Sequence, residues 1–201
     1  MVSTGIFKEP VEGRVMMRTL NLDGDRQADL TVHGGVTKAV YAYPSEHYVF
    51  WRSEFSEMNL PWGMFGENLT VEGLGESSTN IGDKFRIGDA EVMVTEPRMP
   101  CYKLGIKFRR ADIIKRFLVS GRTGFYFSVL KEGEVGAGDE IKNISRDENN
   151  VTIADITRLY AHDKMDIVKM RRALEVKALP ESWKDFFRKQ IEKVLAPYAS
   201  N

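Results

Sequence analysis

The hydrophobic pattern of this 201-residue chain changes character within one polar stretch, Ser145 to Asn150. Before it, short apolar runs are separated by Gly, Asp and Asn, which is typical of strands in a barrel or sandwich. After it, apolar residues recur at helical spacing. The pattern therefore predicts a mainly β protein with some α-helix: a β-barrel domain over residues 1–147 and a small three-helix domain over residues 151–201.

Short apolar runs give the positions of the expected strands. Gly-Asp turns at residues 82–83 and 138–139 each lead into a strand, because Gly and Asp favour tight turns. Alternating or β-branched apolar runs predict further strands at residues 29–33, 39–43, 68–71, 84–87, 91–95 and 125–130.

Two helices are expected inside the β-rich part. The first begins at Ser45, a residue type that caps helices, and its aromatic residues recur at helical spacing as far as Met58. The second covers residues 110–120 and ends at Gly121, because glycine readily takes the left-handed conformation that closes a helix. The apolar stripes of both helices are typical of core packing.

Three helices are expected beyond the polar stretch. Thr152 and Asp155 have the spacing of a capping box, so the first helix begins there. Asp163 or Asp166 opens the second, and Pro180 suits the first turn of the third. A bundle this small is marginal alone, so we expect it to pack on the barrel.

The composition excludes several classes of partner and cofactor. Lys plus Arg and Asp plus Glu both number 29, so net charge gives no reason to expect a nucleic acid polymer or an anionic membrane. One cysteine and three scattered histidines disfavour disulfides, structural zinc and iron–sulfur clusters. No signal peptide or membrane-spanning run is visible, and a single cysteine suits a reducing compartment, so we expect a cytoplasmic protein.

Cys101 is the only cysteine, and it lies in the proline-punctuated run Pro97–Leu104. Arg98 and Lys103 are close to it in sequence. Nearby cations stabilise a thiolate, which is the form that attacks electrophiles and binds soft metals. The alternative is that Cys101 is a buried small apolar residue. Cys101 is therefore a candidate functional thiol whose exposure decides between the two interpretations.

Three other segments place polar groups where strands are expected to end. In His33–Lys38 paired glycines let backbone N–H groups approach an anion, but a plain hairpin turn explains the segment equally simply. Asn68 and Thr70 alternate onto one face of a strand and could bind a polar ligand or serve only as edge residues. Thr4–Lys8 is a polar segment whose simplest interpretation is an N-terminal strand.

Taken in order, these segments form a recognisable set. It comprises Thr4–Val11, Gly24–Asp29, His33–Tyr43, Phe65–Thr70, Pro97–Cys101 and Gly121–Tyr126. The set resembles the MOSC family, named for the C-terminal domain of molybdenum-cofactor sulfurase. More narrowly, it resembles the YiiM-type branch described as 6-N-hydroxylaminopurine resistance proteins, in which a three-helix domain often follows the β-rich domain.

The resemblance implies a β-barrel-like fold that binds a pyranopterin molybdenum cofactor. Cys101 would be the catalytic thiolate and the protein's ligand to molybdenum, which suits a soft metal. The other implied cofactor contacts are Asn68, Thr70 and Arg98 near the cofactor, Thr4, Lys8 and Lys38 at its phosphate and pterin tail, and His33 in the pocket.

The function expected from Cys101 and the resemblance is reduction of N-hydroxylated compounds, such as 6-N-hydroxylaminopurine, to amines. Because the chain has no motif for an electron-transfer cofactor of its own, a separate reductase, expected to be a flavoprotein, would supply electrons. One alternative is a carrier that holds the cofactor, or sulfur, on Cys101 without turnover. Another is a cofactor-free thiol hydrolase with His33 as base.

Overall fold

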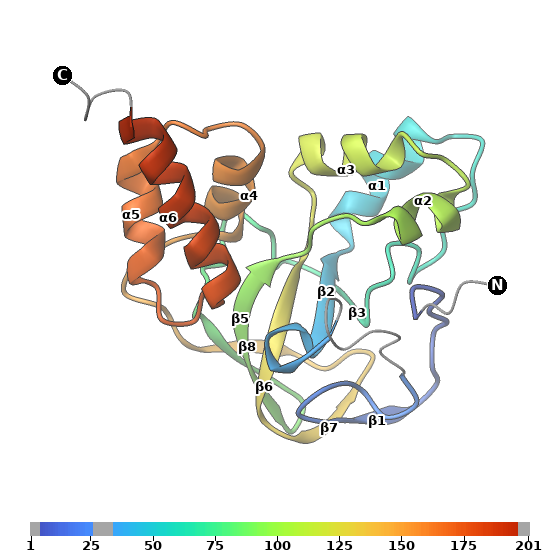
Figure 1. Cartoon of the computed structure of the whole chain (residues 1–201). Helices are drawn as coiled ribbons and strands as arrows, with labels where there is room; N and C mark the ends of the chain where they lie inside the picture. The colour runs from blue at the N-terminus through green and yellow to red at the C-terminus, as the bar shows by residue number, and fades with distance from the viewer. Residues whose placement is uncertain (1–4, 26–33, 197–201) are drawn as a thin grey trace.

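A six-stranded mixed sheet forms the centre of the protein and curves into a half-barrel (Figure 1). The structure, a computed structural model, describes residues 5–25 and 34–196. The strand order is β3-β2-β6-β5-β4-β8, with β2 and β3 parallel and the other pairs antiparallel. The strands are β2 (Val40–Pro44), β3 (Leu69–Val71), β4 (Lys84–Ile87), β5 (Ala90–Pro97), β6 (Phe125–Lys131) and β8 (Ile141–Ser145). A separate antiparallel pair joins β1 (Arg14–Met17) to β7 (Gly133–Gly136).

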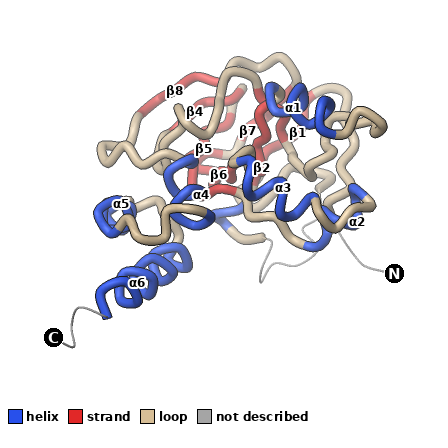
Figure 2. Tube along the Cα trace, turned by 90° about the horizontal axis from the view of Figure 1, so that it is seen from above, coloured by secondary structure: helices blue, strands red, loops and turns tan. Residues whose placement is uncertain are grey.

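The helices gather in two groups on either side of the end of β5 (Figures 1 and 2). The first group is α1 (Glu46–Glu54), α2 (Tyr102–Phe108) and α3 (Ile113–Ser120). The second, called here the three-helix segment, is α4 (Ile153–Ala161), α5 (Ile167–Glu175) and α6 (Glu181–Leu195). The 3-10 helix η1 (Val36–Lys38) precedes β2. The predicted fold class, mainly β with α-helices and a C-terminal helical domain, is confirmed.

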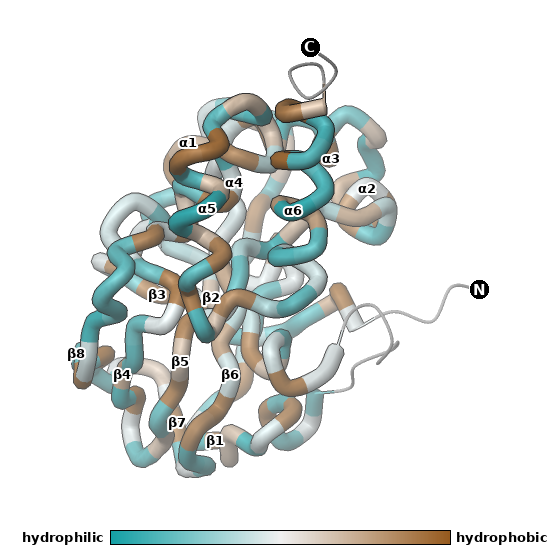
Figure 3. Tube along the Cα trace, turned by 60° about the vertical axis from the view of Figure 1, so that its left-hand side comes forward, coloured by the Kyte–Doolittle hydropathy of each residue, from teal (hydrophilic) through white to brown (hydrophobic). Residues whose placement is uncertain are grey.

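The buried apolar side chains of the described residues form two hydrophobic cores. One lies between the sheet and the three-helix segment and contains Val94, Phe127 and Phe187. The other is aromatic, packs against α1–α3, and contains Tyr43, Trp51 and Phe117 among others. In Figure 3 the tubes of α5 and α6 alternate between hydrophilic and hydrophobic colours, as amphipathic helices packed on one face should.

Local sequence signals gave several helix ends, although α1 ends at Glu54 rather than Met58 and α3 begins at Ile113 rather than residue 110. Gly121 closes α3 with φ of 67°, and Thr152 and Asp155 form a complete capping box at the start of α4. Of the two candidates, Asp166 rather than Asp163 caps α5, and its carboxylate accepts from the Lys169 N–H. The helix α2 directly after Cys101 was not expected from the sequence.

The predicted strands at residues 39–43, 68–71, 84–87, 91–95 and 125–130 correspond to β2–β6, and the strand expected after the turn at 138–139 corresponds to β8, whereas β1 and β7 were missed. The predicted strand at residues 29–33 lies outside the described residues. The interpretation of Thr4–Lys8 as a strand was wrong for residues 5–8, which form none. The Lys107 ammonium donates a hydrogen bond to the Ile6 carbonyl at 2.7 Å. That backbone oxygen is therefore satisfied without a strand partner. Among the described helices, none is both long and apolar enough to cross a membrane.

Gly124, just before β6, has a conformation and surroundings that only glycine tolerates. Its φ is +60°, and an added Cβ would meet the Ala42 carbonyl and lie 2.8 Å from the Tyr43 ring. Gly124→Ala should therefore lower the free energy of unfolding by ~1–2 kcal/mol through left-handed strain and by a further ~1–3 kcal/mol through overpacking. Urea unfolding measures this loss. Gly73→Ala is the control, because Gly73 has φ of +74° with nothing within 4 Å. Equal losses in the two variants would contradict this account.

Candidate functional site

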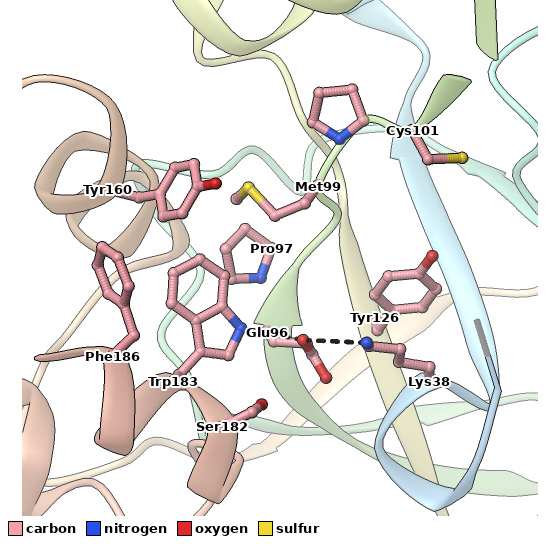
Figure 4. Close-up of a pocket in the computed structure, with 11 residues that line it drawn as sticks. Lys38, Glu96, Pro97, Met99, Cys101, Tyr126, Tyr160, Ser182, Trp183 and Phe186 are labelled. Atoms are coloured by element: carbon pink, nitrogen blue, oxygen red, sulfur yellow. Dashed lines mark hydrogen bonds and ion pairs between the residues drawn. The ribbon is translucent and has the colours of Figure 1, made fainter. Parts of the chain in front are cut away.

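Cys101 lies at the mouth of a cavity of about 400 Å³, a volume within the ~300–1,000 Å³ of small-molecule sites. Strand β5 leads into the Pro97–Cys101 segment, and the thiol is partly exposed just before α2. The exposure removes the alternative that Cys101 is sealed in apolar core. The cavity is lined by Lys38, Glu96, Pro97, Met99, Pro100, Cys101, Tyr126, Tyr160, Ser182, Trp183 and Phe186 (Figure 4).

Tyr126, on β6, is the polar side chain below the thiol. Its hydroxyl is directed toward the Cys101 side of the cavity (Figure 4). Burial raises the pKa of the Tyr126 hydroxyl, and the nearby Cys101 charge adds to that rise, while the Arg98 guanidinium opposes it. Tyr126 therefore keeps its proton at neutral pH and can donate a hydrogen bond beside the sulfur.

Arg98 follows β5 and is almost fully buried, with 5% of its surface exposed. Its guanidinium carbon lies 5.0 Å from the centre of the Phe117 ring and 5.5 Å from that of Tyr41. Its Nη1 has no hydrogen-bond partner among the described residues. A buried charged donor without a partner is costly, so this nitrogen is a strong candidate for binding an anionic or carbonyl oxygen.

A cationic group extends from Arg98 toward the N-terminal segment and consists of Arg98, Lys107 and Lys8. Burial lowers the pKa of the Lys107 ammonium to about 8, Glu67 opposes the shift, and the positive charges of Lys8 and Arg98 add to it. These cations lie within electrostatic range of one another, and a bound anion would relieve the repulsion that the Asp25 and Glu67 carboxylates leave. Lys107 was missed from the sequence, where no local signal distinguishes it from an ordinary surface lysine.

Two predicted cofactor residues meet in this group through one carboxylate. Lys8 forms an ion pair with Asp25, and Asn68 donates to the other Asp25 oxygen at 2.8 Å. The Asn68 carbonyl oxygen accepts from the Tyr41 N–H at 3.0 Å, which fixes its orientation. The structure thus brings together Lys8, Asp25 and Asn68 from three separate sequence segments.

Thr70 has a structural partner. Its hydroxyl donates to Glu67 at 3.2 Å. The buried Glu67 carboxylate also accepts from the Gly63 and Phe65 N–H groups at 2.9 and 3.0 Å and from the Tyr48 hydroxyl. Glu67 therefore holds the loop that precedes Asn68, a role that the sequence motif did not reveal.

Lys38 lies apart from Lys8 and lines the cavity. It forms an ion pair with Glu96 at 3.8 Å, and the neighbouring Thr37 hydroxyl donates to Glu96 at 3.2 Å. The other two predicted cofactor contacts, Thr4 and His33, lie outside the described residues. Their roles stay predictions.

The three-helix segment supplies the far wall of the cavity, which was also missed from the sequence. Tyr160 lies in the last turn of α4, and Trp183 and Phe186 lie in the first turns of α6. The Trp183 indole N–H donates to the Glu96 carboxylate at 2.9 Å. Burial raises the pKa of Glu96 above its ordinary value, although Lys38, Trp183 and Thr37 favour the charged form.

The residues around Cys101 fit a pyranopterin molybdenum cofactor. The Cys101 thiol is a soft ligand in the lining of the cavity. Among the described residues, no group of three His, Cys, Asp or Glu side chains could hold a metal ion. The unpartnered Arg98 nitrogen and the cationic group suit the oxygens and the phosphate of such a group.

Comparison with known proteins identifies the family. The model for the MOSC domain matches residues 29–142, and the model for the YiiM-like, 3-alpha helix domain matches residues 151–194. The chain therefore belongs to the MOSC domain family, as the sequence resemblance implied, and has the additional helical domain of YiiM-like members.

Individual relatives agree with this assignment. The chain is 43% identical to the YflK protein of Bacillus subtilis (strain 168) over 194 residues, which are 96% of this chain and 87% of YflK. The crystal structure of YiiM from Geobacillus stearothermophilus matches with a TM-score of 0.83 and 35% identity, covering 94% of this chain and 90% of that one. A Gibberella moniliformis (strain M3125 / FGSC 7600) protein named "Reductase" is 33% identical over 161 residues, 79% of this chain but 28% of that protein.

Glu96→Gln tests the electrostatic state of the cavity. Because the pKa of Glu96 is raised above 4.5 in the folded state, the folded protein holds a proton that the unfolded chain releases as the pH rises above 4.5. That contribution to stability is complete below pH 4.5 and is lost as the pH rises through the folded pKa. Glutamine does not titrate, so the unfolding free energy of Glu96→Gln relative to the unaltered protein should increase with pH across this window.

Denaturant unfolding at a series of pH values from below 4.5 to neutral measures this difference. Glu91→Gln is the control, since Glu91 lies on the same strand but pairs with Arg86 at 2.9 Å on a more exposed face. A relative stability of Glu96→Gln that falls as the pH rises would mean that Glu96 is stabilised as the charged form.

Proposed function

We propose that this protein is a molybdenum-cofactor-dependent reductase of N-hydroxylated compounds, such as 6-N-hydroxylaminopurine. The observation that carries the proposal is the partly exposed Cys101 in the cavity lining, with Arg98 and its buried, unpartnered nitrogen three residues before it. The MOSC family and the relative named "Reductase" support an oxidoreductase-type activity.

The chain's own residues would hold the cofactor beside Cys101. Cys101 would ligate the metal, and Arg98 would bind an oxygen close to it. Lys8, Lys107 and Asn68 would bind the phosphate and pterin end, where charged donors hold a dianion well. Thr4, His33, Thr70 and Lys38 stay candidate contacts from the family resemblance.

The reaction needs two electrons and two protons per substrate. The N–O bond of the hydroxylamino group breaks, the nitrogen becomes an amine, and the oxygen leaves as water. The bound cofactor supplies the two-electron chemistry, while the protein binds and orients the substrate. Tyr126 presents its protonated hydroxyl beside Cys101 and can donate a hydrogen bond to a reacting oxygen there. A separate reductase, proposed to be a flavoprotein, would supply the electrons.

Cys101→Ser tests the metal ligand. Since a serine hydroxyl is a harder and weaker ligand, the variant purified from a host that makes the cofactor should lose bound molybdenum. Its reduction of 6-N-hydroxylaminopurine should fall by at least the ~10–100-fold that changes around metal sites typically cost. Molybdenum per protein is measured by elemental analysis, and activity with an added flavoprotein reductase.

Met99→Leu is the matched control, because Met99 lines the same cavity and this swap conserves volume. It should retain molybdenum. Because Cys101 is the only cysteine, alkylation of the loaded protein reads its occupancy directly, and bound metal should protect it. Full molybdenum content and activity in Cys101→Ser would refute the proposal. Loaded protein that reduces nothing but passes its cofactor to an apoenzyme would replace the reductase with the carrier alternative.

A further inference from the structure

The cavity beside Cys101 has a wall of aromatic rings that the proposed cofactor contacts leave unused. The Tyr160 and Trp183 ring centres are 5.6 Å apart, and those of Tyr160 and Phe186 are 5.2 Å apart. All three rings line the cavity from the three-helix segment (Figure 4). Their edges and faces form a surface suited to a flat, aromatic ligand.

The opposite wall is also largely apolar and comes from the end of β5. It consists of Pro97, Met99 and Pro100, with Tyr126 at its base. Small-molecule sites are typically apolar with a few placed polar groups that fix orientation. Here those polar groups are Glu96 and Lys38, which lie together on one side (Figure 4).

Glu96 has the capacity to bind a ligand N–H group. A carboxylate offers about four acceptor sites on its two oxygens. One oxygen accepts from Trp183 at 2.9 Å and faces Lys38 at 3.8 Å, and the other accepts from Thr37 at 3.2 Å. These contacts hold the carboxylate in place and leave it able to accept a hydrogen bond from an amino or ring nitrogen.

Of the proposed cofactor contacts, Lys38 lines this cavity, but the cationic group does not. Arg98, Lys107 and Lys8 do not line this cavity, and the helix α2, which carries Lys107, is separated from α4–α6 by the end of β5 (Figure 1). Cys101 follows Arg98 by three residues and lines the cavity. A ligand in this cavity would therefore lie beside Cys101.

We propose that this cavity binds the flat, nitrogen-containing aromatic ring of the substrate, between the rings of the three-helix segment and the Pro97–Pro100 wall, with Glu96 accepting a hydrogen bond from it. This inference rests on the proposed function, and it assigns the residues that would bind the substrate ring. N-hydroxylated heteroaromatic bases fit the site, whereas small aliphatic N-hydroxylated compounds gain nothing from the rings.

Ser182→Phe is the sharpest test, because Ser182 lines the cavity but is exposed at the start of α6. The added ring should fill the cavity without disturbing the core. Binding of adenine to the full-length protein, measured by titration calorimetry, should weaken about tenfold or more, the scale of a lost base–aromatic stack. The ratio of kcat/KM for 6-N-hydroxylaminopurine to that for N-hydroxyurea should fall by a similar factor.

Lys189→Phe is the matched control, since Lys189 is exposed on the same helix and does not line the cavity. It should leave adenine binding and the kcat/KM ratio unchanged. Tyr160→Ala removes part of the aromatic wall instead of filling the cavity, and it should also weaken adenine binding about tenfold. Melting temperatures of all variants identify any that fail to fold.

The outcomes separate this inference from the proposed function. If the unaltered protein does not bind adenine saturably, or if Ser182→Phe and Tyr160→Ala leave binding and the kcat/KM ratio unchanged, the cavity is not the ring site, even where reduction is measured. If loaded protein reduces neither compound, yet adenine binds and both variants weaken it, the proposed function fails and the ring site stands.

Discussion

An interruption of the β5–β6 ladder at Thr95 sets the direction of every side chain at the end of β5. Val94 pairs with Phe127 and Glu96 pairs with Tyr126, so two steps along β5 match one step along β6. Paired residues share a face of an antiparallel sheet, and consecutive residues alternate faces. This β-bulge therefore moves Glu96 from the Val94 and Phe127 face to the Tyr126 face. Thr95 secures the irregularity with hydroxyl contacts to the Thr37 and Tyr126 carbonyls at 2.6 and 3.1 Å.

The consequence is that β5 serves both cores and the site at once. The earlier residues of β5, such as Val94, pack in the core beneath the three-helix segment. On the other face of the sheet, Tyr126 of the neighbouring strand β6 packs against the aromatic core of α1–α3. The Pro97–Cys101 segment leaves the strand between them. It delivers Arg98 to the aromatic core and Met99 and Cys101 to the cavity. Bulges commonly re-aim side chains next to functional sites, and this one joins Glu96 to the cavity of Cys101.

The sequence predicted what is encoded locally. The capping box of Thr152 and Asp155 spans four residues, and the Gly121 closure needs only the backbone freedom of one. The site depends on distant partners. Trp183 is 87 positions from Glu96, and Lys107 is 101 positions from Ile6, so neither contact has a local signal. The family resemblance singled out Cys101, Arg98 and Asn68, but the bulge, the burial of Lys107 and the aromatic wall follow from pairing and packing that no single segment specifies.

The bond from Trp183 to Glu96 makes the three-helix segment part of the site and part of the fold together. Helices this short depend on the sheet for burial of their apolar faces. The sheet in turn depends on them, because removing the indole would leave a buried carboxylate with one donor fewer, at a cost of about 1–3 kcal/mol. A chain without α4–α6 would lose the cavity wall, a partner of Glu96 and a core at the same time. The separate contribution of these helices to ligand recognition is therefore best measured at cavity positions such as Ser182, where the side-chain volume can change while the Trp183–Glu96 bond stays.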